Sequence, residues 1–317
     1  MTLPDFLVIG AYKSGTSSLQ QYLRAHPEIF VPEYKEPRFF AFDGEPEQIA
    51  KTNPMYQGAV VDLDAYERLF APSTTERAIG EVSPEYLKHG PSAKRIAARI
   101  PEVKLIAVLR NPVERAFSDY LMYRRDGRES ETHFLTALKA QQSRLAAGEA
   151  TGQYLVTGNY ADQLEVYYQQ FDPSQIKVVL QDDLITDRDE TMAELYEFLG
   201  VDPSVSVAPE PNLNRSGVFT DPVSRSLYAA RRRLGPLVRT VVPGSVKQQI
   251  DQRFEARLAR PALEHDAESW LNDYYSDQIT RTAELTGIDL SLSLIHISEP
   301  TRRYAISYAV FCLKKKK

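Results

Sequence analysis

The passage from residue 6 to residue 19 constrains the fold more than any other part of the chain. An apolar run, Phe-Leu-Val-Ile-Gly10, opens into a turn of small and hydroxyl-bearing residues and then into a helical pattern with Leu19, Tyr22 and Leu23. The run has the length of a buried strand, and the three later residues have helical spacing. We therefore expect a strand that enters a helix through a tight turn. Backbone N–H groups of such a turn and the positive end of the helix together favour an anion.

The glycines of this turn have the spacing of a nucleotide-binding P-loop, but the lysine is displaced. Gly10 and Gly15 have four residues between them, as that motif requires, whereas Thr16 occupies the lysine position and Lys13 comes three residues earlier. The sequence thus favours a phosphate compound that is bound without the usual metal geometry. A strand-to-helix turn that binds nothing is the alternative, and the unbroken row of small or hydroxyl-bearing residues makes it the weaker one.

Strand patterns alternate with helical patterns along most of the chain. This alternation predicts a P-loop-like three-layer α/β fold, with a central, mainly parallel sheet and helices on both faces. Strands are expected at residues 6–10, 104–109 and 176–180, with a fourth at about 78–81. Helices are expected at about 16–25, 92–98, 112–125, 160–170 and 190–199, the last one ending at Gly200.

The length of 317 residues suits one large domain. We expect a single domain over residues 1–291, with a nucleotide-binding core at about 5–220 and a C-terminal helical part at about 225–290. Residues 292–317 resemble the in-frame translation of a transposon-based sequencing adapter and are expected to lie outside the native fold. The only cysteine, Cys312, belongs to this stretch, so neither a disulfide nor thiol catalysis is expected.

Composition narrows the location and the partners. A hydrophobic content of 43% with 10% aromatic residues is typical of a globular protein. No apolar run approaches the roughly 20 residues of a membrane-spanning helix, and residues 3–9 follow no basic flank, so we expect a cytoplasmic protein without a transmembrane segment. The formal net charge of −5 makes nucleic acid an unexpected partner. The oligomeric state stays open.

A second group of polar residues follows the expected strand at 104–109. Arg110, Asn111 and Pro112 lead into a helical pattern that carries Ser118 about two turns later. Asn111 suits the N-cap of that helix and Pro112 its first position. A guanidinium with a hydroxyl nearby can bind a phosphate, because the guanidinium donates two parallel hydrogen bonds and the hydroxyl adds one more.

Arg110 is expected at the same edge of the sheet as Lys13, because the carboxyl ends of parallel strands form one ligand crevice. A magnesium-dependent P-loop enzyme would be expected to offer an aspartate at such a strand end, whereas this chain offers a cation. The alternative is an ordinary ion pair of Arg110 with Glu114 or Asp119.

Five motifs occur here in the order found in sulfotransferases that use 3′-phosphoadenosine 5′-phosphosulfate. The chain resembles the branch that contains the heparan sulfate N- and 3-O-sulfotransferases and their bacterial relatives. The resemblance covers roughly residues 5–220 and implies the same donor nucleotide, with no metal required. The motifs are Lys13-Ser-Gly-Thr-Ser-Ser, Lys35-Glu-Pro-Arg-Phe-Phe, Gly80-Glu-Val-Ser-Pro-Glu-Tyr, Arg110-Asn-Pro-Val-Glu-Arg-Ala-Phe-Ser and Phe198-Leu-Gly.

The resemblance implies a role for each matching residue. Lys13 would stabilise the charge that develops on the bridging oxygen during in-line transfer. Arg110 and Ser118 would hold the 3′-phosphate of the nucleotide. The 5′-phosphosulfate would be held by Lys13, Ser14, Gly15, Thr16, Ser17 and Ser18. Arg215, Ser216 and Gly217 are similar to a late loop of the resembled family that closes over the nucleotide.

Two carboxylates are candidates for the general base, which must take a proton from the acceptor. Glu36 matches the catalytic glutamate of the resembled family, and Phe39 and Phe40 are expected to anchor its segment in the core. Glu81 is the rival, because it ends an expected strand at the active edge. The sequence leaves open that Glu36 only pairs with a neighbouring basic residue and that Glu81 only braces the turn after it.

The acceptor half departs from the resembled 3-O-sulfotransferases, which have His, Asp and Lys where this chain has Arg38, Ala41 and Val82. We therefore expect a sulfotransferase that acts on a hydroxyl or amine of a carbohydrate, lipid-linked or small-molecule acceptor other than heparan sulfate. One alternative is a nucleotide-binding protein without catalysis. A P-loop kinase is a further alternative, which the displaced Lys13 disfavours.

Overall fold

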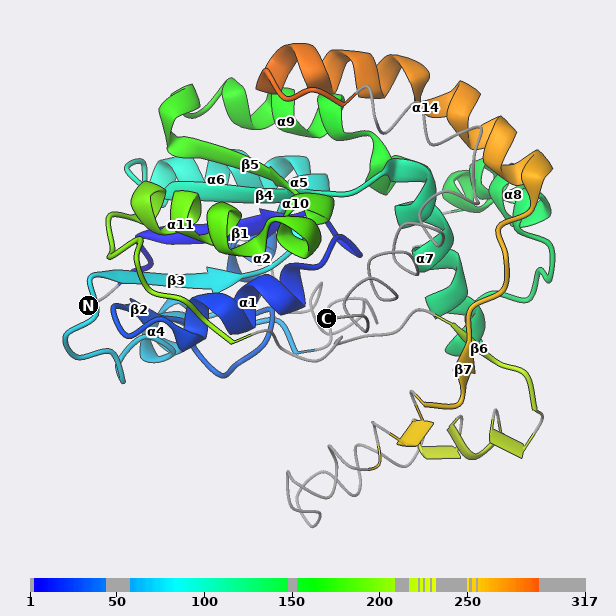
Figure 1. Cartoon of the computed structure of the whole chain (residues 1–317), viewed down its shortest axis with the longest axis horizontal. Coiled ribbons are helices and arrows are strands. Elements are labelled where there is room, and N and C mark those ends of the chain that lie inside the picture. The colour runs from blue at the N-terminus through cyan, green and yellow to red at the C-terminus, as the bar shows by residue number, and fades with distance from the viewer. Residues whose placement is uncertain are drawn as a thin grey trace, which may run out of the picture.

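A parallel five-stranded sheet forms the centre of the molecule (Figure 1). The computed structural model describes residues 3–43, 58–147, 153–208, 217–221, 223–224, 226–228, 230–231, 250, 253–254 and 256–290. The strand order is β2-β3-β1-β4-β5, and every neighbouring pair is parallel. The strands are β1 (Phe6–Gly10), β2 (Ile29–Phe30), β3 (Ala78–Val82), β4 (Lys104–Leu109) and β5 (Ile176–Leu180).

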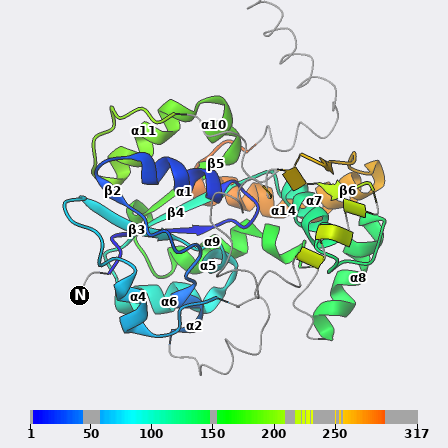
Figure 2. The same cartoon turned by 90° about the horizontal axis from the view of Figure 1, so that it is seen from below.

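Helices cover both faces of the sheet and give three layers (Figure 2). One face carries α1 (Thr16–Ala25), α10 (Gln181–Thr186) and α11 (Arg188–Leu199); the other carries α2 (Phe39–Phe42), α4 (Leu63–Arg68), α5 (Glu85–Lys88), α6 (Gly90–Arg99) and α9 (Tyr160–Tyr168). Successive strand residues alternate between the two faces. Leu7 and Ile9 of β1 therefore pack against the second group, and Phe6 and Val8 against the first. Burial on both faces explains why β1 and β4 are almost continuously apolar.

A third core lies beyond the carboxyl ends of the strands. It joins α7 (Pro112–Arg125), α8 (Phe134–Ala146) and α14 (His265–Thr286), and a small antiparallel pair, β6 (Val218–Phe219) and β7 (Leu258–Ala259), lies beside α7. Figure 1 shows α14 running over α9 and on towards α8. The Tyr275 hydroxyl of α14 donates hydrogen bonds to the carbonyl oxygens of Tyr154 (3.1 Å) and Leu155 (2.9 Å). This contact fixes α14 to the segment before α9, which includes the short 3₁₀ turn Val156–Gly158.

Most sequence predictions of the central fold are confirmed. The strands at 6–10, 104–109 and 176–180 and the helices at 16–25 and 112–125 have the expected bounds, and Gly200 ends α11 in the left-handed conformation, with φ 82°. The prediction of helix throughout 225–290 is wrong at Leu258–Ala259, which form β7, although α14 confirms its last part. Residues 291–317, including the adapter-like stretch, lie outside the described residues. Within the described part of the chain, no helix is long and apolar enough to cross a membrane.

Candidate active site

The connection from β1 to α1 is held between its two neighbouring strands. The Ala11 N–H donates to the Val108 carbonyl of β4 (2.7 Å), and the Ser83 N–H after β3 donates to the Val8 carbonyl (3.0 Å). Because all these strands are parallel, the segments that follow β1, β3, β4 and β5 meet at one edge of the sheet. Figure 1 shows this edge facing α7.

Residues 11–15 form a tight turn in which two residues have left-handed backbone conformations. Lys13 has φ 70° and Gly15 has φ 89°, a region that favours glycine because a Cβ atom is crowded there. Gly15 also approaches Gln181, the first residue of α10, since a Cβ at position 15 would lie 3.0 Å from Gln181 Nε2. The N–H groups of Ser18 and Leu19 donate to the Gly15 carbonyl and begin α1. The turn thus places Lys13 beside the amino end of a ten-residue helix.

The surroundings of Lys13 lower its pKa to about 8. Burial is the main cause, because it disfavours the charged ammonium. The Asp119 carboxylate opposes this effect, while the guanidinium groups of Arg125 and Arg110 add to it. Charges from the end of β4 and from the region of α7 therefore act together on Lys13.

Arg110 and Ser118 occupy the positions expected from the sequence, at the end of β4 and in α7. Asn111 caps α7, because its Oδ1 accepts from the N–H groups of Val113 (2.9 Å) and Glu114 (3.2 Å). Arg110 pairs with Glu114 at 2.8 Å, so the alternative of an ordinary ion pair is also correct for this structure. The side chain of Arg110 is 14% exposed and that of Glu114 is 44% exposed, whereas Ser118 is buried. A ligand phosphate can therefore compete with a solvent-facing carboxylate for Arg110.

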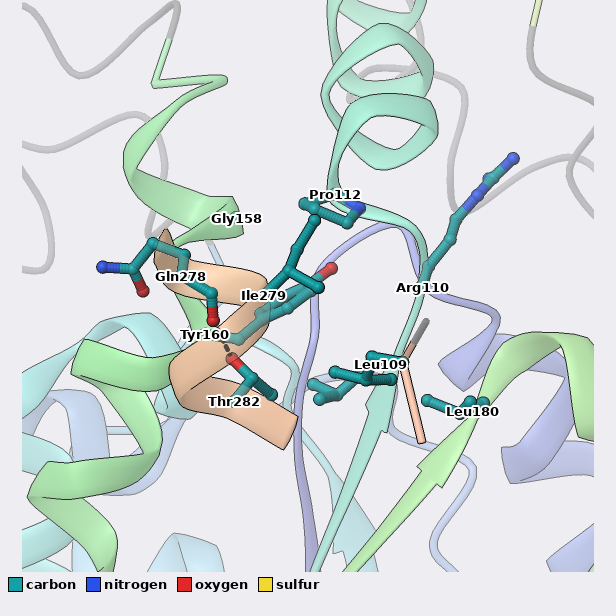
Figure 3. A pocket seen from close by; sticks show the side chains of 10 residues that line it. Leu109, Arg110, Pro112, Gly158, Tyr160, Leu180, Gln278, Ile279 and Thr282 are labelled. Carbon is teal, nitrogen blue, oxygen red and sulfur yellow. Dashed lines mark hydrogen bonds between the residues drawn. The ribbon is translucent and has the colours of Figure 1, made fainter. Parts of the chain in front are cut away.

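A small cavity of about 20 Å³ lies below Arg110 (Figure 3). It is enclosed by the end of β4, by α9 and by α14, and Leu109, Leu180 and Ile279 give it apolar walls. The Arg110 side chain points away from these walls. The cavity is a packing defect with room for about one water, and the guanidinium is directed out of it.

Glu36 lies in a segment that two left-handed residues bend sharply. Glu36 has φ 52° and Arg38 has φ 55°, on either side of Pro37. The Arg38 guanidinium donates to Glu36 Oε2, and each side chain is 18% exposed. The alternative that Glu36 pairs with a neighbouring basic residue is therefore met by Arg38. The carboxylate remains partly accessible at the edge of the sheet.

Phe39 and Phe40 anchor this segment, as the sequence predicts. Both are in α2 and are 1% and 0% exposed. The Phe39 ring stacks on Tyr66 of α4 with a centroid distance of 4.3 Å, and the Phe40 N–H donates to the Tyr86 hydroxyl oxygen at 3.3 Å. Burial of rings of this size contributes about 1.5–3 kcal/mol each. This packing therefore fixes the position of the segment that carries Glu36.

Glu81 is completely enclosed in β3. Hydroxyl groups donate to both of its oxygens, from Tyr86 (2.6 Å) and Tyr66 (3.2 Å) to Oε1 and from Ser83 (2.7 Å) to Oε2. Burial raises the pKa of Glu81 to about 7, against the opposing effect of these three hydrogen bonds. The Arg38 N–H donates to Ser83 Oγ at 3.0 Å. Glu81 is thus connected through Ser83 to the backbone beside Glu36, an arrangement that braces the segment.

Other residues of the site were missed or cannot be placed. Gln181 was not predicted from the sequence, although its position directly after a parallel strand was a usable signal. Burial raises the pKa of Tyr160, and the nearby Arg115 and Ser14 partly offset that rise. Arg215 and Ser216 lie outside the described residues. Gly217 lies against β7, where a Cβ would be 2.8 Å from the Ala259 carbonyl oxygen.

Metal ligands do not gather anywhere in the described part of the chain: no three His, Cys, Asp or Glu side chains are placed to hold one ion.

Comparison with known proteins identifies the family. Residues 3–216 match the model of the sulfotransferase domain, so the chain belongs to the sulfotransferase family. Human bifunctional heparan sulfate N-deacetylase/N-sulfotransferase 3 is 28% identical over 290 residues, which are 89% of this chain and 30% of that protein. Human heparan sulfate glucosamine 3-O-sulfotransferase 6 is 29% identical over 201 residues, which are 62% of this chain and 52% of that protein. The chain thus spans about a third to a half of these relatives.

A solved structure extends the similarity to the whole fold. The crystal structure of a sulfotransferase from Alicyclobacillus acidocaldarius superposes with a TM-score of 0.70 at 28% identity, over 92% of this chain and 99% of that one. The expected three-layer α/β fold and the resemblance to the heparan sulfate sulfotransferase branch are therefore confirmed.

Proposed function

We propose that the protein transfers a sulfuryl group from 3′-phosphoadenosine 5′-phosphosulfate to a hydroxyl or amine of an acceptor. Membership of the sulfotransferase family supports the reaction class. The observation that carries the proposal is the pair of cations at one sheet edge, Lys13 in the turn after β1 and Arg110 after β4. A magnesium-dependent P-loop enzyme would be expected to have an acid at the second place.

The residues present fit the two anionic groups of this donor. The Lys13 to Ser18 turn offers backbone N–H groups, an ammonium and the amino end of α1 to a 5′-phosphosulfate. Gly15, which has no Cβ, leaves the backbone open to a close approach. Arg110 and Ser118 would hold the 3′-phosphate, with Arg110 exchanging Glu114 for the ligand. The donor supplies an activated sulfuryl group, and the protein supplies the charge around it.

The surroundings of Glu36 and Glu81 suggest different roles for these two carboxylates. Glu36, partly exposed at the edge of the sheet, would take the proton from the acceptor as its oxygen or nitrogen bonds to sulfur. Lys13 would stabilise the negative charge on the bridging oxygen as its bond to sulfur breaks. Glu81 is enclosed by three hydroxyl groups, which supports a bracing role for it.

The proposed acceptor is a carbohydrate, a lipid-linked molecule or another small molecule. Two relatives carry heparan sulfate in their names, but this chain has Arg38, Ala41 and Val82 where the 3-O-sulfotransferases have His, Asp and Lys. The side chain of Arg38 is occupied by Glu36, and Ala41 is buried. A cytoplasmic location also stays a prediction.

The direct test incubates the full chain with ³⁵S-labelled donor, a chelator and a panel of alcohols, phenols, amines and sugars. We expect labelled product without added magnesium. Glu36→Gln should lower the turnover by about 100-fold or more, the usual effect of losing a general base, while binding of adenosine 3′,5′-bisphosphate persists. Glu33→Gln is the matched control, because the Glu33 side chain is 93% exposed three residues away.

Three outcomes would each contradict a different part of the proposal. Normal binding of the bisphosphate with no transfer to any acceptor would favour the nucleotide-binding protein without catalysis. Magnesium-dependent transfer of phosphate from ATP would favour the kinase. Loss of transfer in Glu81→Gln but not in Glu36→Gln would make Glu81 the base.

A further inference from the structure

Asp119 of α7 is a buried acid that the proposed chemistry does not use. Its side chain is 4% exposed, and its Oδ2 accepts from Arg115 Nη1 at 3.2 Å. Arg115 is fully buried and also donates to the Tyr154 carbonyl. The other oxygen, Oδ1, is buried and has no hydrogen-bond partner among the described residues. A buried carboxylate oxygen without a partner costs free energy, so its retention calls for an explanation.

The phosphate-binding turn lies against the face of α7 that carries Asp119. Residues three and four positions apart share one face of a helix, so Met122 and Tyr123 lie on the Asp119 face. The Tyr12 hydroxyl, next to Lys13, donates to Met122 Sδ at 3.3 Å. This contact places residues 12–13 beside that face of α7, one turn from Asp119.

We propose that Asp119 is a positioning residue, whose carboxylate, anchored by Arg115, keeps the Lys13 ammonium charged and directed at the bridging oxygen. This inference rests on the proposed role of Lys13. Arg115 fixes Oδ2, so that Oδ1 is the atom left to face the turn. An acid held in this way acts through Lys13 and does not touch the reacting atoms.

The charges around Lys13 agree with this assignment. Asp119 is the acid that most strongly raises the pKa of Lys13, and Asp126, the C-cap of α7, adds a smaller rise. Arg125 of α7 and Arg110 after β4 act in the opposite direction. With a pKa of about 8, Lys13 is close to losing its proton near neutral pH, so removal of Asp119 would leave a substantial fraction of it uncharged.

The same carboxylate also acts on both aromatic neighbours of the turn. Burial and then Asp119 raise the pKa values of Tyr12 and Tyr123. The carboxylates of Glu85 and Glu36 face Tyr12 as well. Tyr12 and Tyr123 therefore stay protonated over the range in which Lys13 titrates, and they do not obscure its titration.

The test measures the titration of Lys13 itself in the nucleotide-free full chain. Acetylation of Lys13 by acetic anhydride is followed by peptide mass spectrometry between pH 6 and pH 10, because only the uncharged amine reacts. We expect a wild-type midpoint near 8 and a midpoint about one pH unit lower in Asp119→Asn. Asp126→Asn, at the C-cap of the same helix, is the matched control, with a smaller shift.

A merely structural role for Asp119 would leave the midpoint of Lys13 unchanged, and that result would overturn the proposal. Asp119→Asn leaves Arg115 buried without its counter-charge, which can prevent folding. In that case Arg115→Met combined with Asp119→Asn removes both charges and should show the same lowered midpoint. The measurement needs no nucleotide, so a missing shift overturns the role of Asp119, whereas a missing sulfate transfer in the wild type overturns the proposed function.

Discussion

Replacing Glu81 by glutamine tests whether this carboxylate braces the site as a neutral group. Its pKa lies at about 7 in the folded protein, against an ordinary value of 4.5. Below pH 4.5 the group is protonated in both the folded and the unfolded chain. Between pH 4.5 and pH 7 only the folded chain keeps the proton, so the free energy of unfolding falls as pH rises. Above pH 7 the free energy of unfolding has fallen by about 3 kcal/mol in total, at 1.36 kcal/mol for each pKa unit.

The Glu81→Gln variant lacks this titration. We expect its free energy of unfolding, relative to the wild type, to increase by about 3 kcal/mol between pH 4.5 and pH 8. Urea unfolding followed by circular dichroism at several pH values measures the difference. Glu33→Gln should follow the wild type at every pH, because that side chain is 93% exposed. A difference between Glu81→Gln and wild type that does not change with pH would refute the reasoning and make Glu81 an ionised rival to Glu36 again.

Three further predictions concern the nucleotide site and its support. Arg110→Ala should remove most of the preference for adenosine 3′,5′-bisphosphate over adenosine 5′-phosphate in calorimetric titrations, by roughly 2–5 kcal/mol; an unchanged preference would place the 3′-phosphate elsewhere. Gly15→Ala should weaken bisphosphate binding by about tenfold, because its φ of 89° and the contact with Gln181 disfavour a Cβ, whereas Gly127→Ala, with φ 69° in open space, should bind normally. Phe39→Ala should lower the free energy of unfolding by about 3–5 kcal/mol, because the ring is 1% exposed; a loss below about 1 kcal/mol would show that the segment is not anchored there.

The sheet and the turn after β1 were predictable because local signals agree there. Continuous apolar runs define β1, β4 and β5, and Asn111 with Pro112 marks the start of α7. The two residues of β2 are too few to give a periodic pattern. Leu258–Ala259 forms a strand only because it pairs with residues 218–219, about 40 positions away. Such pairing leaves no local signal.

The parts of the candidate site that depend only on the order and direction of the strands were predictable from the sequence. Parallel strands bring the segments after β1 and β4 to one edge, so the proximity of Lys13 and Arg110 followed from their places in the sequence. The hydrogen bond from the Arg38 backbone to Ser83 spans 45 positions and depends on packing that the sequence does not reveal. For the same reason the burial of Asp119 against Arg115 was indistinguishable from ordinary surface pairing.

The left-handed backbone at Glu36 lowers the stability of the fold at the residue that is proposed as the catalytic base. Most residues with a Cβ lose roughly 1–2 kcal/mol of stability in this conformation, whereas glycine, which has no Cβ, and asparagine, whose short polar side chain can hydrogen-bond locally, adopt it more readily. Selection for stability alone would therefore replace Glu36, and a library screened only for thermal resistance should become enriched in asparagine or glycine at this position. The same clones would lack the carboxylate proposed as the base. A glutamate in a conformation that suits other residues agrees with the proposed role of Glu36 as the base, because the chemistry, and not the folding of the chain, would then determine the side chain.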